Sequence, residues 1–340
     1  MYLKVTDIIE LMDKDLEYCW RALEEVSRSF ALPISKLPEI TRDIYCVSYD
    51  ICRIADTIED SKEKDVEKKR RQLDGFRSIL LEERVVNSGD FIERVNEVMQ
   101  NSRESDLVEN TGRIIRVFSD LPNEIKNSVK NWISHMIYGM KKFLEKEIKT
   151  FEDQDEYCYY VAGTVGNMTT EINYYRGHIN SEEFLKLIKL SRGFGLGLQK
   201  VNIIKNVRTD FMERRRYWPL SLLSKQKIRY DNLFKQENLG SSLIILNELV
   251  INAQRYLFHG LEYTISMPNP QKEIRNYCLI PLFMAIATLS KCYNNPEVLL
   301  SEEEVKISRE MVEEIVMKSE EYSQDNSKIV GYFKELRVKI

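Results

Sequence analysis

Apolar residues recur along this chain with the period of an α-helix, and the residues that interrupt helices are scarce. The 340 residues include only 13 Gly and 8 Pro, so few turns punctuate the chain. No alternating strand pattern and no repeat of fixed period occurs in the sequence. The pattern predicts an all-α protein with helices over 6–30, 37–62, 64–83, 104–118, 122–149, 153–176, 182–211, 240–264, 270–294 and 302–338, the last one interrupted.

Composition narrows the class of protein. The hydrophobic content of 43% is enough for a large core, and no Gly/Ser/Pro-rich linker divides the chain. We therefore predict a single domain over 1–340. The formal net charge of −4 argues against a protein that neutralises a nucleic-acid backbone, so no nucleic-acid partner is expected.

The chain carries no evident targeting or membrane segment. Its N-terminus lacks the long apolar region of a secretory signal, and the longest nearly apolar run, Cys278–Leu289, is too short to span a bilayer. The C-terminal residues are charged and offer no tail anchor. The six cysteines form no C-x-x-C pair, which indicates reduced, buried thiols. We expect a soluble, cytoplasmic protein.

Two aspartates on a predicted helix form the first informative motif, within Tyr49–Asp60. Asp56 and Asp60 are four residues apart and therefore lie on one face, one turn from each other. Carboxylates at this spacing suit Mg²⁺, which proteins hold with one or two carboxylates plus substrate phosphates. Arg53, one turn earlier, could contact a diphosphate or an acid. An ordinary surface pair of acids is the alternative reading.

A polar stripe runs along the predicted helix 182–211. Gln199, Asn202, Asn206 and Asp210 recur at steps of three and four, while the residues between them are apolar. Oxygen donors inside an apolar helix are costly unless they face water, a metal or a ligand. Lysine and arginine side chains that could hold an anion follow nearby: Lys205, Arg208, Arg214, Arg215 and Arg216. An exposed polar face is the alternative.

Tyrosines stand beside small residues in a third segment, 155–166. Tyr157 and its neighbours could stabilise a carbocation with their ring faces or donate a proton, and Ala162, Gly163 and Gly166 would let a helix or a ligand tail approach closely. Ordinary core aromatics are the alternative. The glycines of 193–197 lie in a helical pattern and indicate close packing rather than a dinucleotide loop.

These segments together resemble the squalene/phytoene synthase family of head-to-head prenyltransferases, and within it the squalene synthases. The resemblance covers most of the chain. Its motifs, in order, are Ser27–Phe30, RIADTIED (53–60), MIYGMKKFLEK (136–146), YCYYVAGTVG (157–166), LQKVNIIKN (198–206), RRYWP (215–219), IPLFMAIATLSKCYNN (280–295) and Val305–Arg309.

The resemblance implies a single-domain class I isoprenoid synthase fold with a central active-site cavity. It implies that Asp56 and Asp60 hold Mg²⁺, and that three oxygens face them from the opposite helix: Asn202, Asn206 and Asp210. It places Tyr157 near the reacting carbons with Tyr49 and Phe30. Substrate contacts would come from Ser27, Ser29, Arg53, Gln199, Asn202, Lys205 and Arg215.

The implied reaction is a Mg²⁺-dependent condensation of two farnesyl diphosphates through presqualene diphosphate, completed by NADPH reduction to squalene. Lys306 and Arg309 match a basic stretch associated with NADPH. The metal would neutralise the leaving diphosphate without a protein nucleophile, and an apolar pocket would shield the cation. We also expect a monomer, with peripheral membrane contact for product release.

One departure from the family pattern leaves other outcomes open. The family has aspartate where this chain has Asn206, and an acid where it has Thr209, whereas Asp210 is retained. The amide keeps an oxygen ligand but removes a negative charge. Alternatives are a phytoene- or dehydrosqualene-type synthase, a presqualene diphosphate synthase and a terpene cyclase. Outside catalysis, an inactive prenyl-lipid-binding member and a helical scaffold remain.

Overall fold

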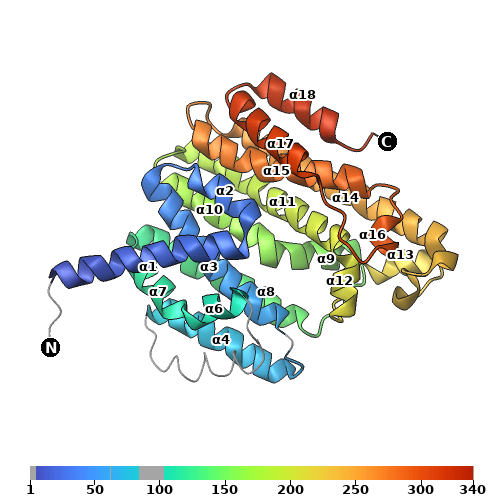
Figure 1. Cartoon of the computed structure of the whole chain (residues 1–340), viewed down its shortest axis with the longest axis horizontal. Coiled ribbons are helices and arrows are strands. Elements are labelled where there is room, and N and C mark those ends of the chain that lie inside the picture. The colour runs from blue at the N-terminus through green and yellow to red at the C-terminus, as the bar shows by residue number, and fades with distance from the viewer. Residues whose placement is uncertain (1–4, 62, 84–102, 340) are drawn as a thin grey trace. The chain divides into compact units, whose positions relative to one another are not determined.

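The computed structural model describes residues 5–61, 63–83 and 103–339, and every regular element in these ranges is a helix (Figure 1). The prediction of an all-α protein is confirmed. The chain divides into two compact units, Met1–Glu145 and Lys146–Ile340. Each unit is described separately below, and a single domain over 1–340 stays a prediction.

The first unit is built around one central helix. Its helices are α1 (Val5–Val26), α2 (Arg28–Ser35), α3 (Glu39–Asp60), α4 (Val66–Glu82), α6 (Arg103–Glu109), α7 (Thr111–Ser119) and α8 (Asn123–Phe143). Helix α3 contacts the other six.

The sequence of α3 explains its central place. Ile44, Val47, Ile51, Ile54 and Ile58 recur every three or four residues, and all five are buried. Burying each such side chain stabilises the fold by about 1.5–3 kcal/mol. The helix that carries the two aspartates is therefore held by packing along its length.

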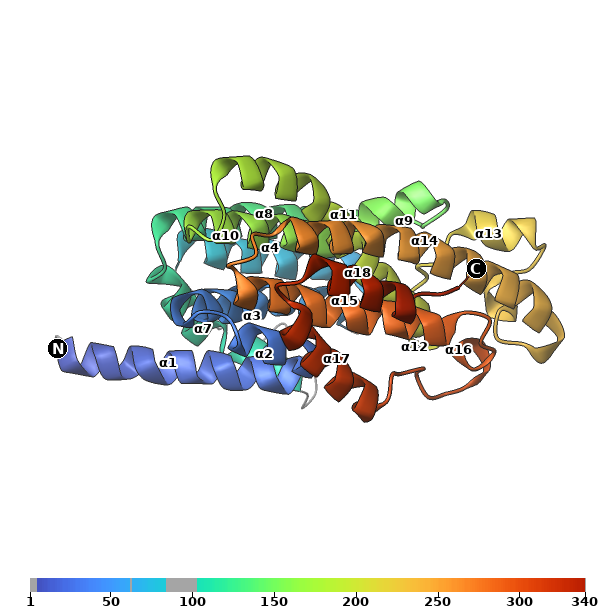
Figure 2. The same ribbon diagram turned by 90° about the horizontal axis from the view of Figure 1, so that it is seen from above.

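The second unit contains the longest helices. Its elements are α9 (Phe151–Cys158), the π-helix η1 (Tyr159–Gly163), α10 (Thr164–Tyr175), α11 (Ser181–Lys205), α12 (Val207–Met212), α13 (Leu220–Lys225), the short 3₁₀ turns η2 (Tyr230–Asn232) and η3 (Gln236–Asn238), α14 (Leu239–Ser266), α15 (Lys272–Cys292), α16 (Glu297–Leu300), α17 (Arg309–Tyr322) and α18 (Asn326–Leu336). Helices α11, α14 and α15 lie side by side at its centre (Figures 1 and 2).

Several predicted helices are divided in the structure. The helix predicted over 6–30 is interrupted at Ser27, where the backbone is non-helical, and that over 104–118 at Asn110. The helix predicted over 182–211 is interrupted at Asn206 (φ −97°, ψ 7°). The prediction of helix over 302–308 is wrong, since α17 begins only at Arg309. Apolar periodicity continues across a single non-helical residue, so it does not reveal such breaks.

A buried arginine ties the turns at one end of unit 2 together. The Arg275 side chain is fully buried. Its Nη1 donates to the Met267 carbonyl at 2.6 Å, and its other nitrogens donate to the Ser323 carbonyl and to Asn326 Oδ1. Burial lowers the pKa of this guanidinium. The turn between α14 and α15 is thereby joined to the turn between α17 and α18.

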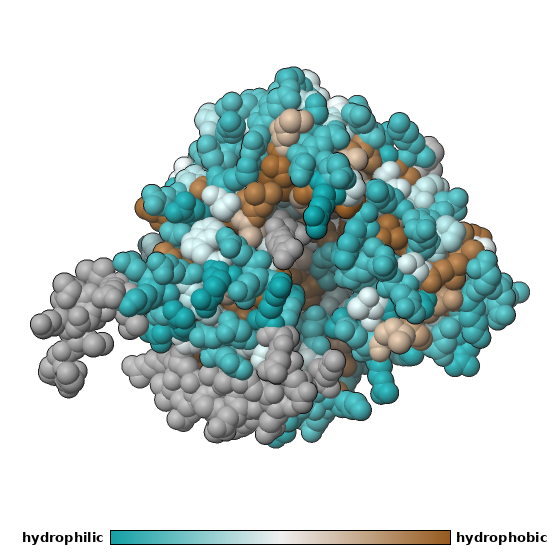
Figure 3. All heavy atoms as spheres, in the orientation of Figure 1, coloured by the Kyte–Doolittle hydropathy of each residue, from teal (hydrophilic) through white to brown (hydrophobic). Residues whose placement is uncertain are grey.

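The cysteines lie in the core, and polar side chains cover most of the surface that Figure 3 draws. All six cysteines are free and buried. On the face drawn in Figure 3, hydrophilic side chains predominate and hydrophobic ones show in small groups. Within the described ranges, every helix is too short or too polar to cross a bilayer.

Asp50 is an unusual member of the core of unit 1. Its side chain is fully buried in α3, and no described residue hydrogen-bonds either carboxylate oxygen. Burial raises the pKa of Asp50 well above its ordinary value. A charged carboxylate without a partner would be very costly here, so the side chain is held as the neutral acid.

We predict that Asp50→Asn makes unfolding less sensitive to pH. An unfolded chain releases this proton near pH 4, whereas the native state retains it to a much higher pH. Between the two pKa values the native state binds more protons, so the free energy of unfolding falls as pH rises, by about 1.4 kcal/mol per pH unit from this group. Urea unfolding at pH 5 and pH 7 measures this effect. The free energy of unfolding of Asp50→Asn, relative to that of the wild type, should be higher at pH 7 than at pH 5. A constant difference would contradict a buried neutral acid.

Candidate active site

The two aspartates of the first motif lie at the C-terminal end of α3. Asp56 is half-buried and Asp60 is exposed. Burial raises the pKa of Asp56 to about 7; the Arg53 guanidinium opposes this shift and the Asp60 carboxylate adds to it. Arg53 Nη2 also pairs with Glu104 Oε1 at 3.3 Å, and its buried Nε finds no hydrogen-bond partner among the residues that the structure describes. The motif thus combines two carboxylates with a cation that keeps an unused donor.

Three other predicted residues gather beside this motif. The Tyr49 ring lies 5.6 Å from the Phe30 ring, centroid to centroid, and the rings are tilted by 37°. Burial raises the pKa of Tyr49 to about 12, while a hydrogen bond from Ser27 and the charge of Arg53 oppose the shift. Ser29 lies in α2, and its side chain falls outside those described. Tyr49 thus packs against Phe30 and interacts electrostatically with both Arg53 and Asp56.

The polar stripe of unit 2 follows α11 into α12. Gln199 and Asn202 lie on α11, Asn206 stands at the break and Asp210 lies on α12. Backbone hydrogen bonds from Asn206 N to Asn202 O (3.0 Å) and from Asp210 N to Asn206 O (2.8 Å) keep the helical stagger through the break. The backbone therefore keeps the helical spacing of the four polar residues, although the helix is divided at Asn206.

Cationic side chains already bind two oxygens of the stripe. Lys205 Nζ donates to Asn206 Oδ1 at 2.9 Å. Asp210 Oδ1 accepts from Nε and Nη2 of Arg215 at 3.2 and 3.1 Å. Both cations were predicted to contact phosphate. In the structure, Lys205 and Arg215 thus lie against oxygens of the stripe.

The predicted cofactor residues lie in and after a non-helical segment. Lys306 Nζ pairs with Glu304 Oε2 at 3.2 Å, and Lys205 Nζ approaches the same oxygen at 3.8 Å. Arg309 is the first residue of α17. Lys205 and Lys306, which are distant in sequence, thus both approach the carboxylate of Glu304. The sequence analysis did not identify Glu304 as a site residue.

Tyr157 is buried in α9, directly before the π-helix η1. Only 3% of its surface is exposed, and its ring stacks on that of Tyr217 with centroids 4.7 Å apart and an angle of 19°. Tyr217 belongs to the RRYWP motif, whose Trp218 is fully buried and donates from Nε1 to the Ile203 carbonyl at 3.2 Å. π-Helical turns are frequent at functional sites. The motif thus anchors the aromatic neighbour of Tyr157 on α11.

Helix α11 packs closely against the small residues that follow Tyr157. A Cβ atom on Gly166 would lie 2.4 Å from the Ser191 carbonyl oxygen, and one on Gly195 would lie 2.3 Å from the Ala162 carbonyl oxygen. Between the two open readings, a helix or a ligand tail, these positions favour the helix. The glycines of α11 are packing residues, as their helical pattern indicates.

The donor set of the first motif fits Mg²⁺. Among the described residues none hydrogen-bonds the Asp56 carboxylate, which leaves hard oxygen ligands available. Within the same ranges, no group of three or more His, Cys, Asp or Glu side chains could hold a metal by itself. An ion bound here would need further ligands, such as the oxygens of a diphosphate.

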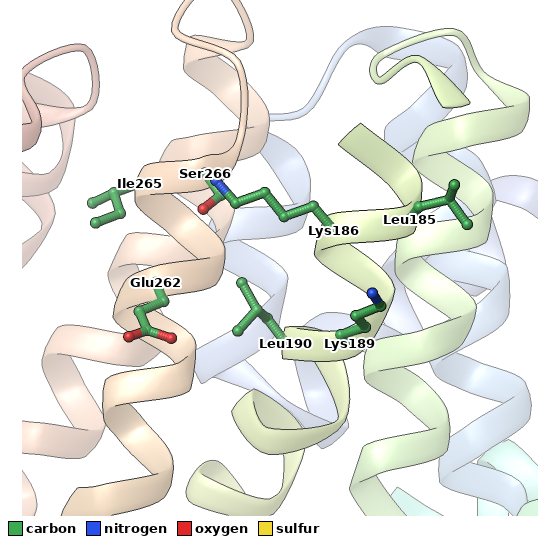
Figure 4. Close-up of a pocket in the computed structure, with 7 residues that line it drawn as sticks. All are labelled: Leu185, Lys186, Lys189, Leu190, Glu262, Ile265 and Ser266. Atoms are coloured by element: carbon green, nitrogen blue, oxygen red, sulfur yellow. The ribbon is translucent and has the colours of Figure 1, made fainter. Parts of the chain in front are cut away.

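A pocket between α11 and α14 lies apart from these residues. Its volume is about 520 Å³, and Figure 4 shows its lining: Leu185, Lys186, Lys189, Leu190, Glu262, Ile265 and Ser266. It contains none of the predicted site residues.

Comparison with known families settles what the chain is related to. The family model for squalene/phytoene synthase matches residues 23–311. The chain belongs to the squalene/phytoene synthase family. Its relatives include the squalene synthase of Dictyostelium discoideum, 34% identical over 83% of this chain, and that of Rattus norvegicus, 32% identical over 84%. The chain spans 65% and 66% of the length of these two relatives.

Solved structures share the fold. The structure of TcSQS with the ligand E5700 matches with a TM-score of 0.85 and 30% identity, over 95% of this chain and 90% of that one. A dehydrosqualene synthase in complex with a ligand matches with a TM-score of 0.67 and 20% identity, over 92% and 97%. The family member described here therefore has the all-α isoprenoid synthase fold that was predicted.

We predict that Gly195→Ala destabilises the protein by about 1–3 kcal/mol or more, because the new methyl group would overlap the backbone of η1. Urea unfolding followed by circular dichroism measures the loss. Gly240→Ala is the matched control: Gly240 lies in the first turn of α14 with no atom within 4 Å of an added Cβ, so the change should be neutral or stabilising by up to about 1 kcal/mol. Equal losses in both variants would contradict the close approach at Gly195.

Proposed function

We propose that this protein condenses two farnesyl diphosphates head to head in a Mg²⁺-dependent reaction, passes through presqualene diphosphate, and uses NADPH to form squalene. The array of Asp56, Asp60 and Arg53 at the end of α3 carries the proposal, because it sets two carboxylates one helical turn apart next to a guanidinium, with the rings of Tyr49 and Phe30 in the same unit. The named relatives, which are squalene synthases, support the choice of substrate and product.

The residues of unit 1 act on the departing diphosphate. Asp56 and Asp60 would hold Mg²⁺, which supplies positive charge to neutralise the leaving group. Arg53 adds a fixed positive charge and a free Nε donor for a phosphate oxygen. The faces of Phe30 and Tyr49 stabilise the farnesyl cation, and Ser27 orients the Tyr49 hydroxyl.

The residues of unit 2 bind substrate and move a proton. Lys205 and Arg215 contact phosphate oxygens, and their departure from Asn206 and Asp210 leaves those oxygens, with Asn202, for a second cation. Attack by the double bond of the second farnesyl chain forms the new carbon–carbon bond, and loss of one proton closes the cyclopropane. Tyr157 lies buried against Tyr217 and handles that proton.

The last step requires a reductant. Bound NADPH would supply a hydride to the carbocation formed when presqualene diphosphate loses its diphosphate. Lys306 and Arg309 would bind the phosphates of this cofactor. Lys306 is 70% exposed and paired only with Glu304 among described residues, so it can reach an anion at small cost.

The decisive test is incubation of the purified protein with farnesyl diphosphate and Mg²⁺, with and without NADPH, followed by mass analysis of the products. Squalene formed only with NADPH supports the proposal. Dehydrosqualene, presqualene diphosphate or a cyclic terpene in both reactions would replace it by a synthase without the reductive step. If neither reaction forms a product, the protein is better explained as an inactive prenyl-lipid-binding protein or a helical scaffold.

We predict that Asp56→Asn or Asp60→Asn lowers turnover by about 10²-fold or more, because each removes charge that stabilises the transition state through the metal. The rate of product formation at saturating substrate measures the loss. Asp43→Asn is the matched control on α3, since an amide can still accept the hydrogen bond from Trp20 Nε1 that Asp43 accepts at 2.9 Å. Unchanged rates in both test variants would remove the metal assignment.

We predict that Lys306→Ala raises the KM for NADPH about tenfold, as expected for one lost charge-assisted hydrogen bond. The rate of presqualene diphosphate formation without NADPH should not change. Lys328→Ala, which removes another exposed lysine paired with a glutamate, serves as control. A variant with the wild-type KM for NADPH would place the cofactor elsewhere.

A further inference from the structure

A fully buried lysine lies at the centre of a polar cluster in unit 2. The Lys200 side chain on α11 is 2% exposed. Its Nζ lies 2.6 Å from Asp155 Oδ1 and donates to Gln154 Oε1 at 2.7 Å. The rings of Phe151 and Tyr256 enclose it, with centroids 5.5 and 5.1 Å from Nζ. Buried lysines are rare, so this one calls for a physical reason.

The cluster continues from Lys200 to Tyr157. Gln154 is buried and uses both ends of its amide: Oε1 accepts from Lys200, and Nε2 donates to the Tyr217 carbonyl at 2.9 Å. The ring of Tyr217 stacks on that of Tyr157. Asp155, on the same helix as Gln154, also accepts a hydrogen bond from the Tyr256 hydroxyl.

Stability alone does not account for the burial of Lys200 against Asp155, whose side chain is 23% exposed. Replacing a buried ion pair with apolar side chains of similar size is often neutral or stabilising, whereas removing one partner is costly. An apolar side chain at position 200 could therefore stabilise the fold about as well as the lysine does. What the lysine adds is orientation, because an ammonium between two oxygens fixes Gln154 and Asp155 of α9.

The place of Tyr157 on α9 makes this orientation matter. α9 has only eight residues, and a π-helix follows it. Gln154 and Asp155 precede Tyr157 by three and two residues, so they set where the helix, and with it the tyrosine, stands relative to α11. The hydrogen bond from Gln154 Nε2 to the Tyr217 carbonyl also positions the ring on which Tyr157 stacks.

We propose that Lys200 is a positioning residue for Tyr157. It holds Gln154 and Asp155 on one side and, through Gln154, the backbone of Tyr217 on the other, so that the Tyr157 hydroxyl is aimed at the reacting carbons. The inference rests on the proposed function of Tyr157. Loss of Lys200 lowers kcat by about 10- to 100-fold, because misplacement by about 1 Å has effects of this size. The KM for farnesyl diphosphate changes less than twofold, since Lys200 does not touch substrate.

The test separates positioning from stability with two variants of the full chain. Lys200→Met removes the charge and leaves the partly exposed Asp155 and the buried Gln154 without their cation, so both the thermal midpoint and kcat should fall. Lys200→Met/Asp155→Asn removes both charges and keeps an acceptor for the Tyr256 hydroxyl. We expect this double variant to regain most of the thermal midpoint while kcat stays at least tenfold below wild type. Recovery of kcat together with the midpoint would overturn the proposal.

A matched control shows whether any buried cation has this effect. Arg275→Met removes a fully buried guanidinium from unit 2 that binds two carbonyls and an amide and does not contact the Lys200 cluster. It should lower the thermal midpoint and leave kcat unchanged at a temperature where it is folded. A loss of kcat equal to that of Lys200→Met would also overturn the proposal.

A readout that needs no turnover keeps the inference separate from the proposed function. Carbon-13 labelling of tyrosine rings reports the stack of Tyr157 on Tyr217, with Tyr157→Phe used to assign its signal. In the double variant the Tyr157 signal should move or broaden, and an unchanged signal overturns positioning by Lys200. A wild type that makes no prenyl product would end the proposed function, and the ring signal would still decide how Tyr157 is held.

Discussion

Backbone atoms of α11 lie directly against backbone atoms of η1 and α10, with no side chain between them. Gly195 meets Ala162, and Gly166 meets Ser191. A similar approach on another side brings Gly197 against Leu257 of α14. Interiors are packed too densely to absorb an added methyl group at such places. The positions of Tyr157, the polar stripe and the Lys200 cluster all depend on this fit, because each of them lies on α11 or on an element packed against it.

The carboxylates of the two units stand in different electrostatic states. Asp56 of unit 1 is desolvated, and Arg53 only partly offsets its rise in pKa. Asp210 of unit 2 is bound by Arg215, and the neighbouring Asn206 by Lys205. An arriving cation would therefore relieve a cost at Asp56, whereas at Asp210 it must compete with a cation of the protein. The two groups of oxygens therefore differ in how readily each could accept a cation.

Each unit also buries ionisable groups that the hydrophobic effect alone would exclude. Among the described residues none hydrogen-bonds the Asp50 carboxylate, Arg275 donates to neutral oxygens, and Lys200 lies against a carboxylate and an amide. The three therefore differ in what they contribute. Arg275 joins turns, Lys200 orients α9, and Asp50 makes the stability of unit 1 depend on pH.

The sequence by itself determined the fold class, the family and the faces on which the carboxylates and amides stand, because helical spacing alone sets which residues share a face. It also indicated that the glycines of 193–197 serve packing. Only the tertiary structure decided where the helices break, that Glu304 brings Lys205 and Lys306 together, and that Tyr157 stacks on Tyr217. It alone showed Lys200 bound to Gln154 and Asp155, about 45 residues earlier in the chain. Such contacts join residues that no periodicity relates, since they arise from how helices pack and not from the order of residues within one helix.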